Sequence, residues 1–268
     1  MESRRMQAMV LASLLVAGCG SDGAGKPATS SKPMQAAVTR PETVRSGALS
    51  LPSAFRLPGV ESVREADSWS ARLATLTNAE RARLEAINAR YFGMLAFASA
   101  EQQQSLVKAG FPMPEEWLAA DAMRDEELAR LAKARSPKGA MFYADRQLDR
   151  YIEARQRMAD KGGVRDVDRS LMHPKVDAML YAGEALALSR SPFAAYMYGS
   201  INAQLFDDPA YTAAAISVAW ALGDVRGQVL SRQFAESMRI AGEGKPDLGN
   251  MMAAERLMWR HVHRYRPL

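Results

Sequence analysis

Cysteine is nearly absent from this chain of 268 residues, which contains a single one, Cys19. A chain with one cysteine forms no internal disulfide, so its stability has to come from a packed core. The Gly-x-Ser-x-Gly and His-Glu-x-x-His motifs and the glycine-rich phosphate loop are missing as well. From these absences we predict no catalytic residue, no metal site and no cofactor.

Apolar β-branched residues are also scarce. Leucine, alanine and the 16 methionines supply most of the apolar content, whereas valine and isoleucine are sparse. Leucine, alanine and methionine favour helices, and β-branched residues favour strands. The composition therefore predicts an all-α fold.

A long hydrophobic run is missing too, but a short one lies near the N-terminus. Arg4 and Arg5 precede an apolar stretch over residues 6–16. A basic start followed by such a stretch is typical of a secretory signal peptide. The stretch is too short to remain in a bilayer as a spanning helix.

The residues after that stretch are small and lead directly to the only cysteine, in the order Leu15-Val16-Ala17-Gly18-Cys19. This segment resembles the lipobox of bacterial lipoproteins. The resemblance implies that residues 1–18 are removed and that Cys19, carrying a diacylglycerol on its thiol, becomes the N-terminus. Membrane lipid would then be one partner, held through Cys19.

The residue after the cysteine bears on location. It is Gly20, whereas an Asp there commonly retains Gram-negative lipoproteins at the inner membrane. The resemblance thus implies a lipid-anchored envelope protein at the outer membrane, facing the periplasm. That compartment disfavours nucleic acid as a partner. The formal net charge of +5 is compatible with anionic lipid, peptidoglycan or an acidic protein.

Composition divides the remaining chain into a tether and a folded part. Residues 19–58 are rich in glycine, proline and serine and contain few large apolar side chains. Such a segment buries too little apolar surface to fold, which predicts a flexible linker. Residues 59–268 are long enough for one core, and we expect a single all-helical domain there.

Caps and apolar spacing predict about eight to ten helices in this domain. Thr77 and Glu80 form a capping box before a helix, and Gly110 ends the next one. Pro114 then suits the first turn of another helix. Further helices are expected over residues 60–76, 209–222, 226–240 and 248–266.

A candidate repeat indicates how some of these helices are connected. Residues 131–143 and 186–198 share seven of thirteen positions, and residues 219–227 form a degenerate third copy. The expected turns between helices are Ser136-Pro137, Ser191-Pro192 and Gly223-Asp224. About one turn later, the small residues expected to allow close packing of the two helices are Ala140, Ala195 and Gly227.

This pattern resembles the helical-hairpin repeats of the tetratricopeptide superfamily, especially the Sel-type repeats. The resemblance implies an irregular, α-solenoid-like array that binds another protein, and it carries over no catalytic residue. The chain departs from the family in the spacing of its copies, 55 and then 32 residues, and in lacking the Leu-Gly pair late in the second helix.

Two other functions remain as alternatives to protein binding. Distant carboxylates can meet in a fold, so an enzyme acting on the cell wall is one alternative. An immunity-type inhibitor is the other, with residues 159–174 as the candidate protruding loop. His261 and His263 form a His-x-His pair, which can hold a metal ion only if both side chains share a face. On a helix their directions diverge by about 200°. We therefore expect them to belong to the basic C-terminal end of the helix.

Overall fold

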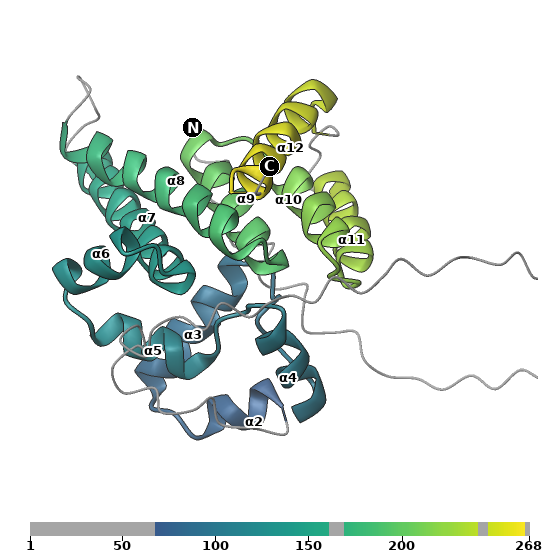
Figure 1. Ribbon diagram of the computed structural model, residues 1–268. Coiled ribbons are helices and arrows are strands. Elements are labelled where there is room, and N and C mark those ends of the chain that lie inside the picture. Colours follow the sequence, from purple (N-terminus) through teal and green to yellow (C-terminus); the bar gives the residue numbers. More distant parts are fainter. Residues whose placement is uncertain (1–67, 161–168, 241–245, 266–268) are drawn as a thin grey trace, which may run out of the picture.

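The computed structural model describes residues 68–160, 169–240 and 246–265. Within these ranges all regular secondary structure is α-helical, in eleven helices (Figure 1). The predicted all-α class is confirmed, with slightly more helices than expected. The predicted signal peptide 1–18 and linker 19–58 lie outside the described residues, so these boundaries stay predictions.

The helices follow one another with short connections. Their bounds are α2 Trp69–Ala74, α3 Asn78–Arg90, α4 Ala100–Lys108, α5 Pro114–Ala122, α6 Asp125–Lys133, α7 Pro137–Asp160, α8 Arg169–Ser189, α9 Pro192–Phe206, α10 Ala210–Ala221, α11 Gly227–Ile240 and α12 Leu248–His263.

Local hydrogen bonds explain why several helices begin where they do. The predicted capping box is present at α3: the Glu80 N–H donates to the Thr77 hydroxyl at 3.3 Å, and the Thr77 N–H donates to the Glu80 carboxylate at 2.8 Å. Ser99 caps α4 and Asp247 caps α12 in the same manner. Each cap satisfies backbone donors that have no partner within the helix.

Helix α9 is the centre of the fold. Twelve of its fifteen residues are buried, and it packs against α7, α8 and α10. Gly199 allows the close crossing with α10, because a Cβ added there would lie 2.2 Å from the Ala215 Cβ. Aromatic side chains join its N-terminal end to the small helices α2–α5, with the Phe193 ring centroid 5.3 Å from that of Tyr91.

The longer helices surround α9 as successive antiparallel neighbours. In Figure 1, α7 and α8 run side by side, and α6 packs against α7. Helix α10 packs against α9, α11 and α12, and α12 also covers one end of α8. The short helices α2–α5 lie together at the bottom of the view.

All three predicted turns connect two helices, and they share a backbone conformation. Arg135, Arg190 and Gly223 each have a left-handed φ, of 61°, 50° and 106°. The next residue then caps: Ser136 and Ser191 accept backbone hydrogen bonds three residues ahead, from Gly139 and Ala194. Asp224 likewise accepts from the N–H of Arg226.

This geometry corrects the register of the third copy. Gly223 is equivalent to Arg135 and Arg190, one position before the serine with which the sequence comparison aligned it. Counting four residues on from the left-handed residue gives Gly139, Ala194 and Gly227. Ala140 and Ala195, the positions expected from the sequence, are fully buried as well. A Cβ at Gly139 would lie 2.8 Å from the Leu131 Cβ, and one at Gly227 would lie 2.8 Å from the Trp220 Cβ.

Some positions differ from what the sequence suggests. Trp220 lies in the helix expected over residues 209–222 but is 55% exposed. His173 and Pro174, which fall within the loop expected over residues 159–174, lie inside α8. The proline is the sixth residue of that helix, and it removes one backbone donor there. The predicted loop 159–174 is described only at its ends, because residues 161–168 lie outside the described residues.

Candidate functional site

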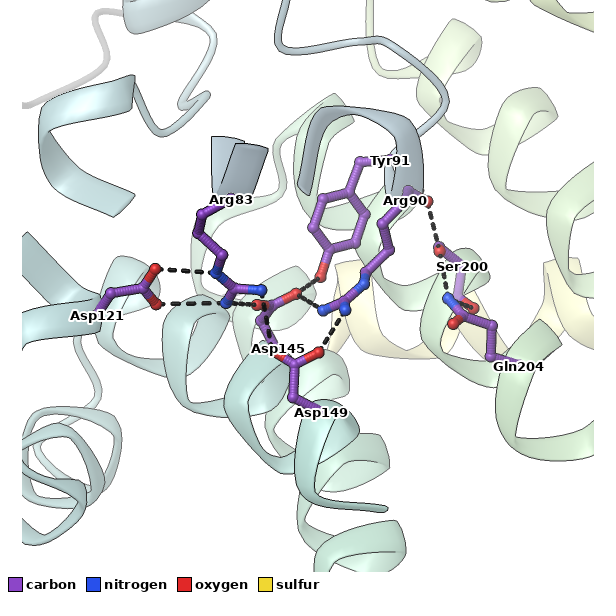
Figure 2. A network of polar contacts seen from close by, with 8 residues as sticks. All are labelled: Arg83, Arg90, Tyr91, Asp121, Asp145, Asp149, Ser200 and Gln204. Carbon is purple, nitrogen blue, oxygen red and sulfur yellow. Dashed lines mark hydrogen bonds and ion pairs between the residues drawn. The ribbon is translucent and has the colours of Figure 1, made fainter. Parts of the chain in front are cut away.

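The largest group of converging charges lies between α3, α5 and α7 (Figure 2). Arg83 and Arg90 are two turns apart on α3, and Asp145 and Asp149 are one turn apart on α7. The Arg90 guanidinium binds Asp145 at 2.5 Å and also pairs with Asp149. Arg83 reaches Asp145 at 3.2 Å, Asp149 at 3.0 Å and Asp121 of α5 at 2.9 Å.

The charges of this network are partly buried, and a buried charge is costly unless it is paired. The Asp145 side chain is only 2% exposed, and it accepts a 2.5 Å hydrogen bond from the Tyr91 hydroxyl. Burial, reinforced by Asp145, raises the pKa of Tyr91 well above its ordinary value. The pKa of Asp149 is raised as well, first by burial and then by the Asp145 charge.

The two arginines remain charged in spite of their surroundings. Burial opposes the charge of Arg90, yet Asp145, Tyr91 and Asp149 together raise its pKa. Arg83 behaves in the same way through Asp121, Asp145 and Asp149. Because arginine cannot release its proton, it serves here to neutralise the carboxylates rather than to transfer protons.

The network extends to α9 through the backbone. The Arg90 carbonyl accepts a 2.8 Å hydrogen bond from the Ser200 hydroxyl, and the Gln204 amide donates to the same hydroxyl at 3.1 Å (Figure 2). The charges therefore hold α3 against α5, α7 and α9. Sequence reasoning did not find this network; its only signal was pairs of like charges spaced to share a helix face.

Beside the network lies a groove of about 630 Å³. We define the α3–α11 groove by its walls, which are α3 and α11, and by its floor of α9 and α10. Its lining residues are Ala86, Ala89, Arg90, Phe92, Ser200, Ala203, Gln204, Thr212, Ile216, Leu230, Arg232, Gln233, Phe234, Glu236, Ser237 and Ile240. Apart from the paired Glu236, no carboxylate lines it.

A second unusual surface is an apolar row on α8. We call Met172, Val176, Met179 and Leu180 the α8 row; these side chains are between 37% and 51% exposed. At about 100° per residue they fall within one sector about 100° wide, which also contains Gly183. A row of this kind on a helix normally faces a packed neighbour.

The two histidines of the C-terminal His-x-His pair are not brought together. The His261 ring packs 5.3 Å from the Tyr198 ring, whereas the His263 ring stacks 5.7 Å from that of Trp259. Burial lowers the pKa of His261, with a further contribution from Arg264. Cys19 lies outside the described residues.

No cluster of three or more His, Cys, Asp or Glu side chains within the described ranges is arranged to hold a metal ion. Among the same residues, every helix is too short or too polar to cross a membrane.

Comparison with known proteins finds no match to any family model, curated protein or solved structure. The assignment of function therefore rests on the geometry described above.

Proposed function

We propose that this protein is a lipid-anchored component of the bacterial envelope whose helical domain binds another protein through the α8 row. The observation that carries the proposal is that the α8 row continues a face of α8 whose C-terminal half already packs against α12. Gly183 lies in the same sector, and a Cβ added there would be 2.6 Å from the His261 ring of α12.

Helix α12 covers only the C-terminal half of that surface. Besides His261 at Gly183, the Tyr265 hydroxyl donates to Glu184 at 2.9 Å, and Arg264 pairs with the same carboxylate at 3.3 Å. One to three turns earlier, Met172, Val176, Met179 and Leu180 continue the row without a covering helix among the described residues.

The chemistry of the uncovered row favours one kind of partner. An amphipathic helix of another protein, lying in line with α12, would place its apolar face on the row. Two of the four side chains are methionines, whose flexible thioethers adapt to an uneven apolar surface. A partner helix of this kind fits the expectation from the hairpin-repeat resemblance that the domain binds proteins.

The test is cross-linking in the intact envelope with a photoreactive amino acid in place of Val176. The matched control carries it in place of Val225, which is 79% exposed at the α10–α11 turn. We expect a cross-link from position 176 alone, to an apolar helix face of one other protein. Leu180→Asp should abolish it without changing the melting temperature.

Other outcomes of that experiment contradict the proposal. A cross-link to a second copy of this chain would make the α8 row a self-association surface. A cross-link to the chain's own N-terminal segment would make it an internal contact. Cross-linking to lipid alone would assign the row to the membrane surface.

Anchoring through Cys19 is the second part of the proposal, supported by the lipobox resemblance. Cys19→Ser removes the thiol that would carry the diacylglycerol. We expect the variant to leave the membrane fraction or to remain unprocessed, whereas the unmodified chain sediments with outer-membrane markers. A variant that fractionates and migrates like the unmodified protein would contradict the anchor.

We propose no catalytic activity for this domain. The support is that the buried carboxylates Asp145 and Asp149 are held by Arg83 and Arg90 and that neither lines the α3–α11 groove. A general acid or base has to reach the reacting atom within hydrogen-bond distance. Release of fragments from purified peptidoglycan that is lost in Asp149→Asn would contradict this part.

A further inference from the structure

The α3–α11 groove has features of a ligand site that the proposed protein contact leaves unused. Its floor consists of buried side chains, Ser200 of α9 and Thr212 and Ile216 of α10, and Leu230 lies buried at the base of the α11 wall. Its walls are partly exposed, with Ala86 and Ala89 on α3 facing Phe234 and Ile240 on α11. The lining is thus predominantly apolar, yet open to solvent along one side.

Polar groups occur at a few points of this lining. Thr212 is only 8% exposed, and no hydrogen bond joins its hydroxyl to another described residue. That hydroxyl is not fully enclosed by protein atoms, so it is open to a hydrogen bond with a ligand in the groove. The Gln204 amide nitrogen is already engaged by Ser200, which leaves its oxygen directed to other donors.

The rim of the groove carries one available positive charge. Glu236 is paired with Arg239 at 2.5 Å, and Arg90 is paired with Asp145 and Asp149. Arg232 lines the groove, is exposed and forms no ion pair with a described residue. A guanidinium in this position is suited to bind a carboxylate through two parallel hydrogen bonds.

The size of the groove suits a small ligand. Its volume of about 630 Å³ lies within the range of small-ligand sites. A flexible alkyl chain can adapt to an open apolar groove of this size.

We propose that the α3–α11 groove binds a free long-chain carboxylate, with its alkyl chain between α3 and α11 and its head group at Arg232. The apolar walls bury the chain, which is favourable in proportion to the area removed from water. The cation on the rim selects the anionic head. This binding is independent of a protein partner on the α8 row.

The test uses cis-parinaric acid, a fluorescent long-chain carboxylate, with the full chain carrying Cys19→Ser so that no attached lipid competes. We expect saturable enhancement of fluorescence at one molecule per chain, reversed by palmitate and much less by hexadecanol. Arg232→Gln should weaken binding by roughly threefold, as expected for an exposed ion pair. Arg256→Gln, at an exposed position on α12 outside the groove lining, should not.

Filling the groove provides the decisive variants. Ala89→Trp and Ala86→Trp place an indole in the α3 wall at exposed positions, so the fold does not depend on their small size. Each should abolish binding while the melting temperature stays within a few degrees. Ala82→Trp, at an exposed position one turn earlier on α3 and outside the lining, is the matched control and should bind normally.

Several results would overturn the proposal. The absence of saturable enhancement in the full chain would do so, as would enhancement that survives both Ala86→Trp and Ala89→Trp. Equal displacement by hexadecanol and palmitate would remove the role assigned to Arg232.

Discussion

At the scale of single residues, the main feature is how Asp145 is accommodated. Two arginines and a tyrosine hydroxyl contact a side chain that is nearly inaccessible to water. An ion pair in such surroundings contributes little net stability, because desolvating the charges offsets their attraction. Removing one partner is different, since it leaves the other charges buried without compensation.

Here Asp149 and Asp121 still pair with the two arginines when Asp145 is removed. We therefore expect Asp145→Ala to lower the free energy of unfolding by about 1–3 kcal/mol, because the Tyr91 hydroxyl and one contact of each arginine lose their buried acceptor. Urea unfolding followed by circular dichroism measures the change. Glu236→Ala, which breaks the exposed pair with Arg239, is the control and should leave the unfolding midpoint almost unchanged. Similar midpoints for both variants would contradict the role given to the network.

At the scale of helices and turns, the three predicted connections at Arg135, Arg190 and Gly223 share a left-handed residue. Gly223 takes this conformation without a Cβ, whereas Arg135 and Arg190 adopt it at a cost of about 1–2 kcal/mol each. The two arginines differ in the contacts that their side chains make. Arg135 lies 4.2 Å from the Tyr265 ring centroid and 3.7 Å from Glu184. Arg190 is exposed and makes no such side-chain contact within the described ranges.

This difference gives a paired prediction. Arg190→Gly should raise the free energy of unfolding by up to ~1 kcal/mol, because glycine relieves the left-handed strain and nothing is lost. Arg135→Gly should give a smaller gain or a loss, because its contacts with Tyr265 and Glu184 disappear. Thermal denaturation of both variants in one buffer decides the matter. A destabilised Arg190→Gly variant, or equal gains at both sites, would be inconsistent with it.

At the scale of the whole molecule, burial affects most of the eight tyrosines. Burial is the largest cause of a raised pKa at Tyr91, Tyr143, Tyr181, Tyr196, Tyr198 and Tyr211. For Tyr143, whose hydroxyl donates to Asp177 at 3.0 Å, the pKa rises to about 12. In the unfolded chain each phenol ionises near pH 10.

Stability should therefore fall at alkaline pH. A folded-state pKa above the unfolded value contributes stability that is complete below about pH 10 and is lost as pH rises through the folded pKa. We expect the urea midpoint to drop between about pH 10 and pH 12, and to drop less in Tyr143→Phe. In ultraviolet titration, the folded protein should form less tyrosinate near pH 10 than the urea-unfolded chain. Equal titration curves for the two states would refute this.

The helical class and several helix ends followed from the sequence by itself. The Thr77–Glu80 capping box, the end at Gly110 and the turns at Ser136-Pro137 and Ser191-Pro192 were all predicted. These features depend on hydrogen bonds between residues at most four positions apart, so the information lies in a short segment. Cys19 and the linker belong to the same category of local pattern but stay predictions.

Only the tertiary structure decided which faces meet. It left Trp220 half exposed, placed Gly139 against Leu131, and left the α8 row half covered. It also joined Arg83 and Arg90 to carboxylates 38 to 66 positions away in the chain. The physical reason is that such contacts depend on how whole helices cross, and a crossing is determined by the summed packing of many residues rather than by any one segment.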